Sequence, residues 1–129
     1  MKSFKDLEVW KRAIDLVEDV YSLTAKFPAN EQFGLVSQIR RASVSVPSNI
    51  AEGSGRRSVK ELVQFLHIAS GSLAELETQF IIAKNLGFIA KNEYSEIEQE
   101  IQEIIRMVSA LSNSILNKHN GQRPSSRNS

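Results

Sequence analysis

Apolar residues recur every three or four positions in the segment 35–50, and this helical period continues in phase through Pro47. A proline inside a helix removes one hydrogen-bond donor and crowds a carbonyl one turn earlier, which costs about 3 kcal/mol. A period that persists through such a residue predicts one kinked helix and not two. The hydroxyl groups of Ser43, Ser45 and Ser48 are close enough in sequence to satisfy the backbone groups that Pro47 frees.

Three other segments have the same period, so the sequence predicts an all-α protein. The four helices are expected over residues 6–27, 31–53, 59–86 and 93–117. Short connections favour antiparallel neighbours, and the predicted architecture is an up-down-up-down four-helix bundle over residues 1–116. The basic, polar segment 117–129 contains too few large apolar residues for a packed structure and is expected to be a disordered tail.

The expected helix ends rest on capping signals. Ser3 with Asp6 resembles a capping box, Asn30 is a good N-cap for the second helix, and Ser58 with Glu61 is the strongest capping box of the chain. The first helix has a main and a weaker apolar row, which predicts more than one neighbour. The main row is Leu7, Trp10, Ile14, Val17, Tyr21, Thr24 and Phe27, and the weaker row is Val9, Leu16, Val20 and Leu23.

Composition narrows the class of protein. The 129 residues fit one domain, and the absence of cysteine removes disulfides and thiol chemistry. No apolar run approaches the roughly 18 residues that cross a bilayer, and the N-terminus lacks the apolar core of a signal peptide. The expectation is a cytoplasmic protein that does not enter a membrane.

Charge is unevenly distributed although the net charge is only +1. Residues 40–60 contain five bases and one acid, whereas residues 93–103 contain five glutamates and no base. Such asymmetry can steer a charged partner, but a run of like charges is also typical of a solvated helix face. Both interpretations of the acidic segment stay open.

A polar stripe runs beside the apolar stripe of the second helix, at spacings of three and four residues. It consists of Gln38, Arg41, Ser45, Asn49 and Glu52. Small and polar residues on the third helix, Gly71, Ser72 and Glu75, form a second such region. Both are interpreted as packing or assembly residues, because buried polar groups must find partners and so fix the register of neighbouring helices. Arg41 is expected to pair with Glu75 or Glu77. A ligand site is the alternative for the stripe.

Catalytic and metal-binding patterns are missing from the sequence. There is no Glu-x-x-His pair of the kind that di-iron bundles use, no phosphate loop and no dinucleotide fingerprint. His67 is expected at the surface and His119 in the tail. We therefore expect no enzyme, no metal site and no cofactor.

A basic patch is the better candidate for contact with a partner. Arg56 and Arg57 precede a helix start, where phosphate is favoured, and Arg40 and Lys60 can extend the patch. These four residues are predicted to bind nucleic acid, with an affinity that falls as salt rises.

Several ordered motifs resemble one known family. They are Phe4 with Leu7 and Trp10; Phe27-Pro28 with Glu31 and Gly34-Leu35; the segments 38–42 and 45–53; and the segment 69–77. Together they make the chain similar to the 23S rRNA-intervening-sequence proteins, also called the S23 ribosomal protein family. That family resembles the accessory variability determinant of diversity-generating retroelements.

The resemblance implies a four-helix bundle that assembles into a homopentameric ring, with RNA or DNA and a reverse transcriptase as partners. Two functions stay open at this point. The first is a non-enzymatic oligomeric accessory protein that binds nucleic acid or a ribonucleoprotein through the basic patch. The second is a protein-interaction scaffold that binds no nucleic acid.

Overall fold

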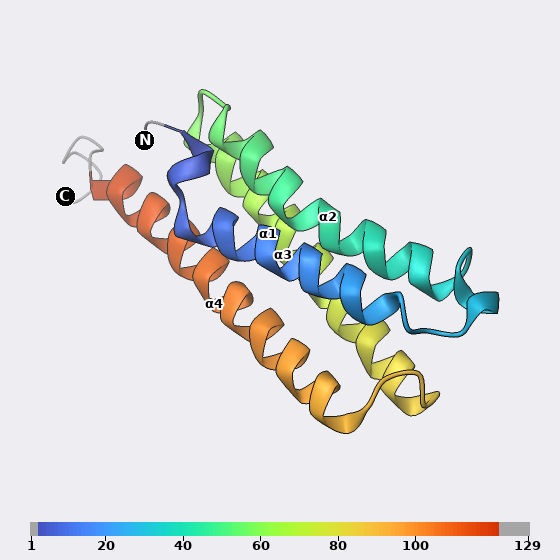
Figure 1. The fold of residues 1–129 in the computed structure, drawn as a ribbon. Coiled ribbons are helices and arrows are strands. Elements are labelled where there is room, and N and C mark those ends of the chain that lie inside the picture. Colours follow the sequence, from blue (N-terminus) through green and yellow to red (C-terminus); the bar gives the residue numbers. More distant parts are fainter. Residues whose placement is uncertain (1–2, 122–129) are drawn as a thin grey trace.

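The computed structural model describes residues 3–121, which form four α-helices packed against one another (Figure 1). The helices are α1 (Glu8–Thr24), α2 (Leu35–Ser54), α3 (Val59–Asn85) and α4 (Lys91–Gly121). Consecutive helices run in opposite directions (Figure 1). Each helix contacts the next, α4 also contacts α1, and no contact crosses either diagonal of the described bundle. The α2–α3 and α1–α4 pairs therefore form opposite sides of the molecule.

The core fills the centre of this square arrangement. Its largest fully buried side chains include Leu16, Ile39, Leu73, Phe80 and Ile101, so all four helices contribute. In α1, the apolar row expected to be the weaker one is the more deeply buried. Val9, Leu16 and Val20 are buried, whereas Tyr21 of the main row is 41% exposed. Thr24 and Phe27 of the main row are also buried, so both rows contribute to the core. The prediction that this helix has more than one neighbour is confirmed, because α1 contacts both α2 and α4.

The chain enters α1 through a short 3-10 helix, η1 (Phe4–Asp6). The Ser3 hydroxyl accepts a hydrogen bond from the backbone N–H of Lys5 at 3.2 Å, so Ser3 caps η1 and not α1. Leu7 is extended and separates the two helices. The prediction of a single helix from residue 6 was therefore wrong at its start, and α1 ends three residues before residue 27.

A second 3-10 helix, η2 (Ala29–Glu31), precedes α2. The prediction that α2 begins at residue 31 after Asn30 was wrong, because Asn30 lies inside η2. The N-cap of α2 is Gly34, and the Glu31 carboxylate accepts a hydrogen bond from the Leu35 N–H at 3.3 Å. A side chain four residues upstream thus supplies the acceptor that Asn30 was expected to provide.

Helix α2 continues through Pro47 without interruption, as the unbroken period predicted. Ser43 donates to the carbonyl oxygen of Arg40 at 2.8 Å, and Ser54 donates to that of Ile50 at 2.9 Å. Gly53 allows α2 to approach α3 closely, because a Cβ there would lie 2.9 Å from the Cβ of Phe65.

Helix α3 begins with the predicted capping box: the Glu61 N–H donates to the Ser58 hydroxyl, which donates to the Glu61 carboxylate, both at 3.1 Å. It ends before Gly87, whose φ of +79° is a conformation that glycine adopts without strain. The Phe88 N–H reaches back to the Ala83 carbonyl oxygen at 2.9 Å and closes the helix end.

Helix α4 is longer than the predicted helix over residues 93–117. It includes residues 117–121, so the expectation of a disordered tail from residue 117 was wrong for these five positions. No proline interrupts the chain between residues 91 and 123, and Leu111 and Ile115 pack against the core in the turns before residue 117. Residues 122–129 of the predicted tail lie outside the described part of the chain. No helix between residues 3 and 121 is long and apolar enough to cross a membrane.

Candidate functional site

The polar stripe of α2 meets α3 through a small hydrogen-bond network. The hydroxyl oxygens of Ser45 and Ser72 lie 2.8 Å apart. The Asn49 amide donates to the carbonyl oxygen of Ser45 at 2.8 Å and to its hydroxyl oxygen at 2.9 Å. These partners cannot act as a general base for the Ser45 hydroxyl, because neither a serine nor an amide accepts a proton at neutral pH. The network joins α2 to α3.

A groove of about 330 Å³ continues from this network between α2 and α3. Gln38, Arg41, Ser45, Glu75 and Gln79 line it together with Ala42. Gln79 is only 7% exposed, and its side-chain oxygen has no hydrogen-bond partner in the described structure. A buried acceptor without a donor costs about 1–3 kcal/mol. The described part of one copy of the chain therefore leaves one buried hydrogen-bond acceptor of this groove, the side-chain oxygen of Gln79, without a donor.

Arg41 does not form the predicted ion pair with Glu75 or Glu77. It is exposed, and no ion pair involving it occurs within residues 3–121. Glu75 lines the same groove without an ion-pair partner. Glu77 lies toward α4, where its carboxylate accepts from the Gln102 amide at 2.6 Å. The prediction failed because the sequence does not give the rotation of α3 relative to α2.

Glu52 and Gly71 occupy the margins of this region. The Glu52 carboxylate pairs with Arg56 one turn later at 2.7 Å and does not cross to α3. Gly71 is exposed, and a Cβ there would meet nothing within 4 Å. Nothing within residues 3–121 packs against Gly71, so a packing role inside one copy is not seen, and its interpretation as an assembly residue stays a prediction.

The four residues of the predicted nucleic-acid patch do not form one surface. The Arg40 Nε donates to the Thr24 hydroxyl at 2.9 Å, and its guanidinium carbon lies 4.4 Å from the centre of the Tyr21 ring. Arg40 thus joins α2 to α1. Sixteen residues separate it from Arg56, or about 24 Å along a helix.

The turn between α2 and α3 holds the other three patch residues. Arg56 pairs with Glu52 and lies 4.8 Å from the centre of the Phe65 ring. Arg57 and Lys60 are exposed and have no ion-pair partner among the described residues. Two of the four predicted residues therefore remain available to a partner.

Both histidines of the chain line one groove, which sequence reasoning missed. The groove measures about 400 Å³ and lies where the first turns of α3 meet the last turns of α4. Lys60, Gln64 and His67 line it from α3, and His119 lines it from α4. Because His119 was predicted to lie in a disordered tail, it was not expected beside His67. The sequence signal that could have shown this is the apolar period of α4, if the helix had been predicted to continue one turn beyond residue 117.

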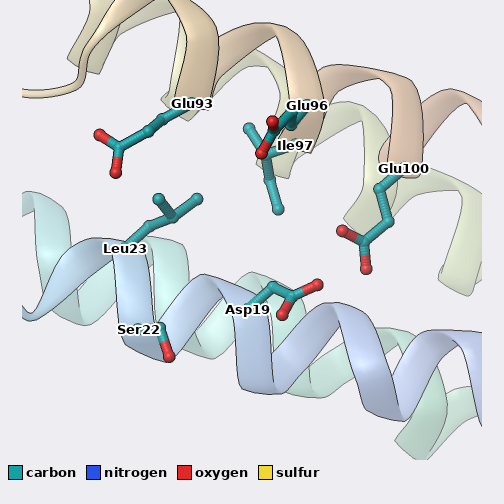
Figure 2. A pocket seen from close by; sticks show the side chains of 7 residues that line it. All are labelled: Asp19, Ser22, Leu23, Glu93, Glu96, Ile97 and Glu100. Atoms are coloured by element: carbon teal, nitrogen blue, oxygen red, sulfur yellow. The ribbon is translucent and has the colours of Figure 1, made fainter.

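The acidic segment of α4 forms a second groove, of about 220 Å³, against α1 (Figure 2). The carboxyl groups of Asp19 and Glu100 point toward one another there, with Glu93 and Glu96 alongside (Figure 2). Burial, followed by the hydrogen bond with Asp19 and the charge of that group, raises the pKa of Glu100 to about 8. Glu100 therefore keeps its proton near neutral pH, facing the Asp19 carboxyl group.

Another carboxyl pair lies on the opposite flank of α4. Burial, followed by a hydrogen bond with Glu77, raises the pKa of Glu98, and the Gln102 amide donates to Glu98 at 2.9 Å. Of the two interpretations of the acidic segment, a wholly solvated face does not describe Glu98 and Glu100. Within the described residues, no cluster of three histidines or acids could hold a metal ion.

These features describe a class: a helical bundle whose polar and charged side chains lie in grooves between its helices. Residues 5–110 match the 23S rRNA-intervening sequence protein family, and the chain belongs to this family. The sequence resemblance to that family is thus confirmed.

A similar solved structure is the crystal structure of a protein with unknown function from the S23 ribosomal protein family of Bacteroides thetaiotaomicron. It superposes with a TM-score of 0.74 at 24% identity, covering 81% of this chain and 97% of that chain. At this identity the likeness shows the fold. No curated protein matches this chain.

Proposed function

We propose that this protein is a non-enzymatic accessory protein that assembles with further copies of itself through its α2–α3 face. We define this face as Gln38, Arg41, Ser45, Ile68, Ser72, Glu75, Gln79, Ile82 and Leu86. The observation that carries the proposal is the buried side-chain oxygen of Gln79, which lines a groove and has no donor within the described chain. A donor from a neighbouring copy would offset this cost.

Spacing along α3 supports a helical partner at this face. Six α3 residues recur at alternating intervals of four and three positions, which is the heptad pattern of a helix-pairing seam. They are Ile68, Ser72, Glu75, Gln79, Ile82 and Leu86. Ile68 is 48%, Ile82 42% and Leu86 58% exposed, so the apolar members of this row are uncovered in a single copy.

Charge supports a further copy as the occupant. A closed ring requires the α2–α3 face of one copy to meet a different face of the next. The opposite side of the bundle is the α1–α4 side, which holds the acidic groove of Asp19 and Glu100 (Figure 2). Arg41, which is exposed and has no ion pair within residues 3–121, is complementary to that groove. The ring of five that the family resemblance implies is compatible with this arrangement.

Two neighbouring isoleucines allow a matched test of the α2–α3 face. Ile81 and Ile82 are 38% and 42% exposed, but only Ile82 belongs to the heptad row. In light scattering after gel filtration, we expect the wild-type protein to have a mass several times the 14.5 kDa of one chain. Ile82→Glu is expected to dissociate it, whereas Ile81→Glu is expected to leave it assembled. A monomeric wild-type protein, or equal effects of the two substitutions, would contradict the proposal.

A charge exchange tests which faces meet. Arg41→Glu is expected to weaken the assembly, because it places a carboxylate opposite the acidic groove. Adding Asp19→Arg to the same chain recreates an opposite-charge pair at every contact and is expected to restore the mass. Failure of the double variant to recover, with both variants folded by circular dichroism, would remove the α1–α4 side as the opposing face.

Nucleic-acid binding is the second candidate function. It is favoured by Arg57 and Lys60, which are exposed and unpaired beside the turn between α2 and α3. Because each neutralised phosphate releases counterions, the affinity for structured RNA or DNA should fall steeply with salt. If no salt-dependent binding of RNA or DNA is found near 50 mM salt, the nucleic-acid function is excluded and the assembly function remains.

A further inference from the structure

The groove between the start of α3 and the end of α4 concentrates basic groups without a compensating acid. Lys60, His67 and His119 line it, and no aspartate or glutamate lines it among the described residues. None of the three side chains has an ion pair or hydrogen bond in the described structure. An anion in this groove would meet the Lys60 ammonium and no negative charge among the lining residues.

Several other cations of the chain have a partner. Arg12 pairs with Glu103, Lys26 with Glu93 and Arg56 with Glu52, and Lys84 lies 4.6 Å from the centre of the Tyr94 ring. The lack of an acid in this groove distinguishes Lys60 from these four cations.

We infer that this groove is a binding site for a terminal phosphate group, with Lys60, His67 and His119 as its ligands. A phosphate monoester carries close to two negative charges at neutral pH and presents three strong acceptor oxygens. Three side chains that can donate hydrogen bonds from two helices match that number of acceptors. Val59, Val63 and Leu116 complete the walls and offer apolar surface to the group that bears the phosphate.

The donors of this site are side chains and not the start of α3. The Ser58 hydroxyl already accepts from the Glu61 N–H in the capping box. The groups that face the two histidines are Lys60 and Gln64 from α3 and Leu116 and Asn120 from α4. Lys60 is the one lysine or arginine that lines the groove, so it supplies the charge that attracts an anion, and the two imidazole rings supply further N–H donors.

The same phosphate chemistry occurs in small phosphorylated molecules and at the 5′ end of a nucleic acid. The probes are inorganic phosphate and two RNA oligonucleotides of one sequence, one with a 5′ phosphate and one with a 5′ hydroxyl. We expect the 5′-phosphorylated RNA to bind at least tenfold more tightly than the 5′-hydroxyl RNA at pH 6. If inorganic phosphate, added at constant ionic strength, displaces the 5′-phosphorylated RNA, the natural ligand is a small phosphorylated molecule. Failure to compete, with the end preference retained, would indicate the end of a nucleic acid.

Substitutions assign the preference to the groove. His67→Gln with His119→Gln is expected to abolish the 5′-phosphate preference, because the phosphate loses both imidazole donors. Lys60→Gln should weaken binding about tenfold, whereas Lys118→Gln, an exposed lysine of α4 outside the groove, is the matched control. Equal binding of both RNAs, or an undiminished preference in the folded double variant, would overturn the inference. Because the groove lies outside the α2–α3 face, loss of assembly in Ile82→Glu should leave the preference intact.

Discussion

The contact between Asp19 and Glu100 makes the stability of this bundle depend on pH in a direction opposite to that of a salt bridge. The folded protein holds a proton on Glu100 up to about pH 8, because its pKa is raised to about 8 from an ordinary value near 4.5. The unfolded chain loses this proton near pH 4.5. Between these values the folded state binds more protons, so the free energy of unfolding falls as pH rises. The stabilising contribution is complete below pH 4.5 and lost above pH 8.

The magnitude follows from the geometry of the groove. One pKa unit corresponds to about 1.4 kcal/mol, but Glu100 is only half-buried and water screens its charge. We therefore expect a loss of about 1–2 kcal/mol between pH 5 and pH 8.5. Glu100→Gln removes the titrating group while its amide still donates to the Asp19 carboxylate. The variant should match the wild-type protein near pH 5 and be about 1–2 kcal/mol more stable at pH 8.5.

Urea unfolding at both pH values, at one fixed protein concentration, measures this difference. Glu96→Gln is the matched control, because Glu96 lines the same groove from the same helix but is exposed. In thermal unfolding the Glu100→Gln gain corresponds to about 4–7 °C at pH 8.5. If the advantage of Glu100→Gln over the wild-type protein is the same at pH 5 and pH 8.5, the pKa of Glu100 is not raised in the folded protein and the reasoning fails.

Two further substitutions test packing, both in the Ile82→Glu background so that assembly does not contribute. Gly53→Ala is expected to destabilise the protein by about 1–2 kcal/mol in urea unfolding, because its Cβ would lie 2.9 Å from that of Phe65. Gly71→Ala, where a Cβ meets nothing, should instead stabilise by about 0.5–1 kcal/mol; the same sign for both would refute the close approach of α2 and α3. Arg40→Ala should cost about 1–2 kcal/mol through its lost contacts with Thr24 and Tyr21, with unchanged binding of RNA. If Arg40→Ala weakens RNA binding without lowering the stability, Arg40 belongs to the nucleic-acid-binding patch and does not serve to join α2 to α1.

Local signals in this sequence were sufficient where the neighbouring residues alone decide the structure. The capping box of Ser58 and Glu61 and the end of α3 at Gly87 depend on contacts within one turn. The continuity of α2 through Pro47 was also correct, because an in-phase apolar stripe keeps both halves against the same core. The predicted start of α2 was not correct, because the Glu31 carboxylate, four residues upstream, accepts the hydrogen bond from the Leu35 N–H.

Contacts between helices required the structure. The sequence placed Arg41 and Glu75 on outer faces of their helices, but not the rotation that leaves both without an ion pair. His67 and His119 are 52 positions apart, and their meeting depends on where α4 ends relative to α3. The acidic run of α4 gave no sign that Glu98 and Glu100 face carboxyl groups on two different helices.

The two proposed sites use different sides of α3, and this arrangement lets one reinforce the other. Gln79 and Ile82 lie on the side of α3 shared with α2, whereas Lys60 and His67 line a groove with α4. An assembly that covers the α2–α3 face would therefore leave each phosphate groove open and repeat it once per copy. A ligand with several phosphate ends would then bind more tightly than the single groove allows, because each later contact is made at a high effective concentration.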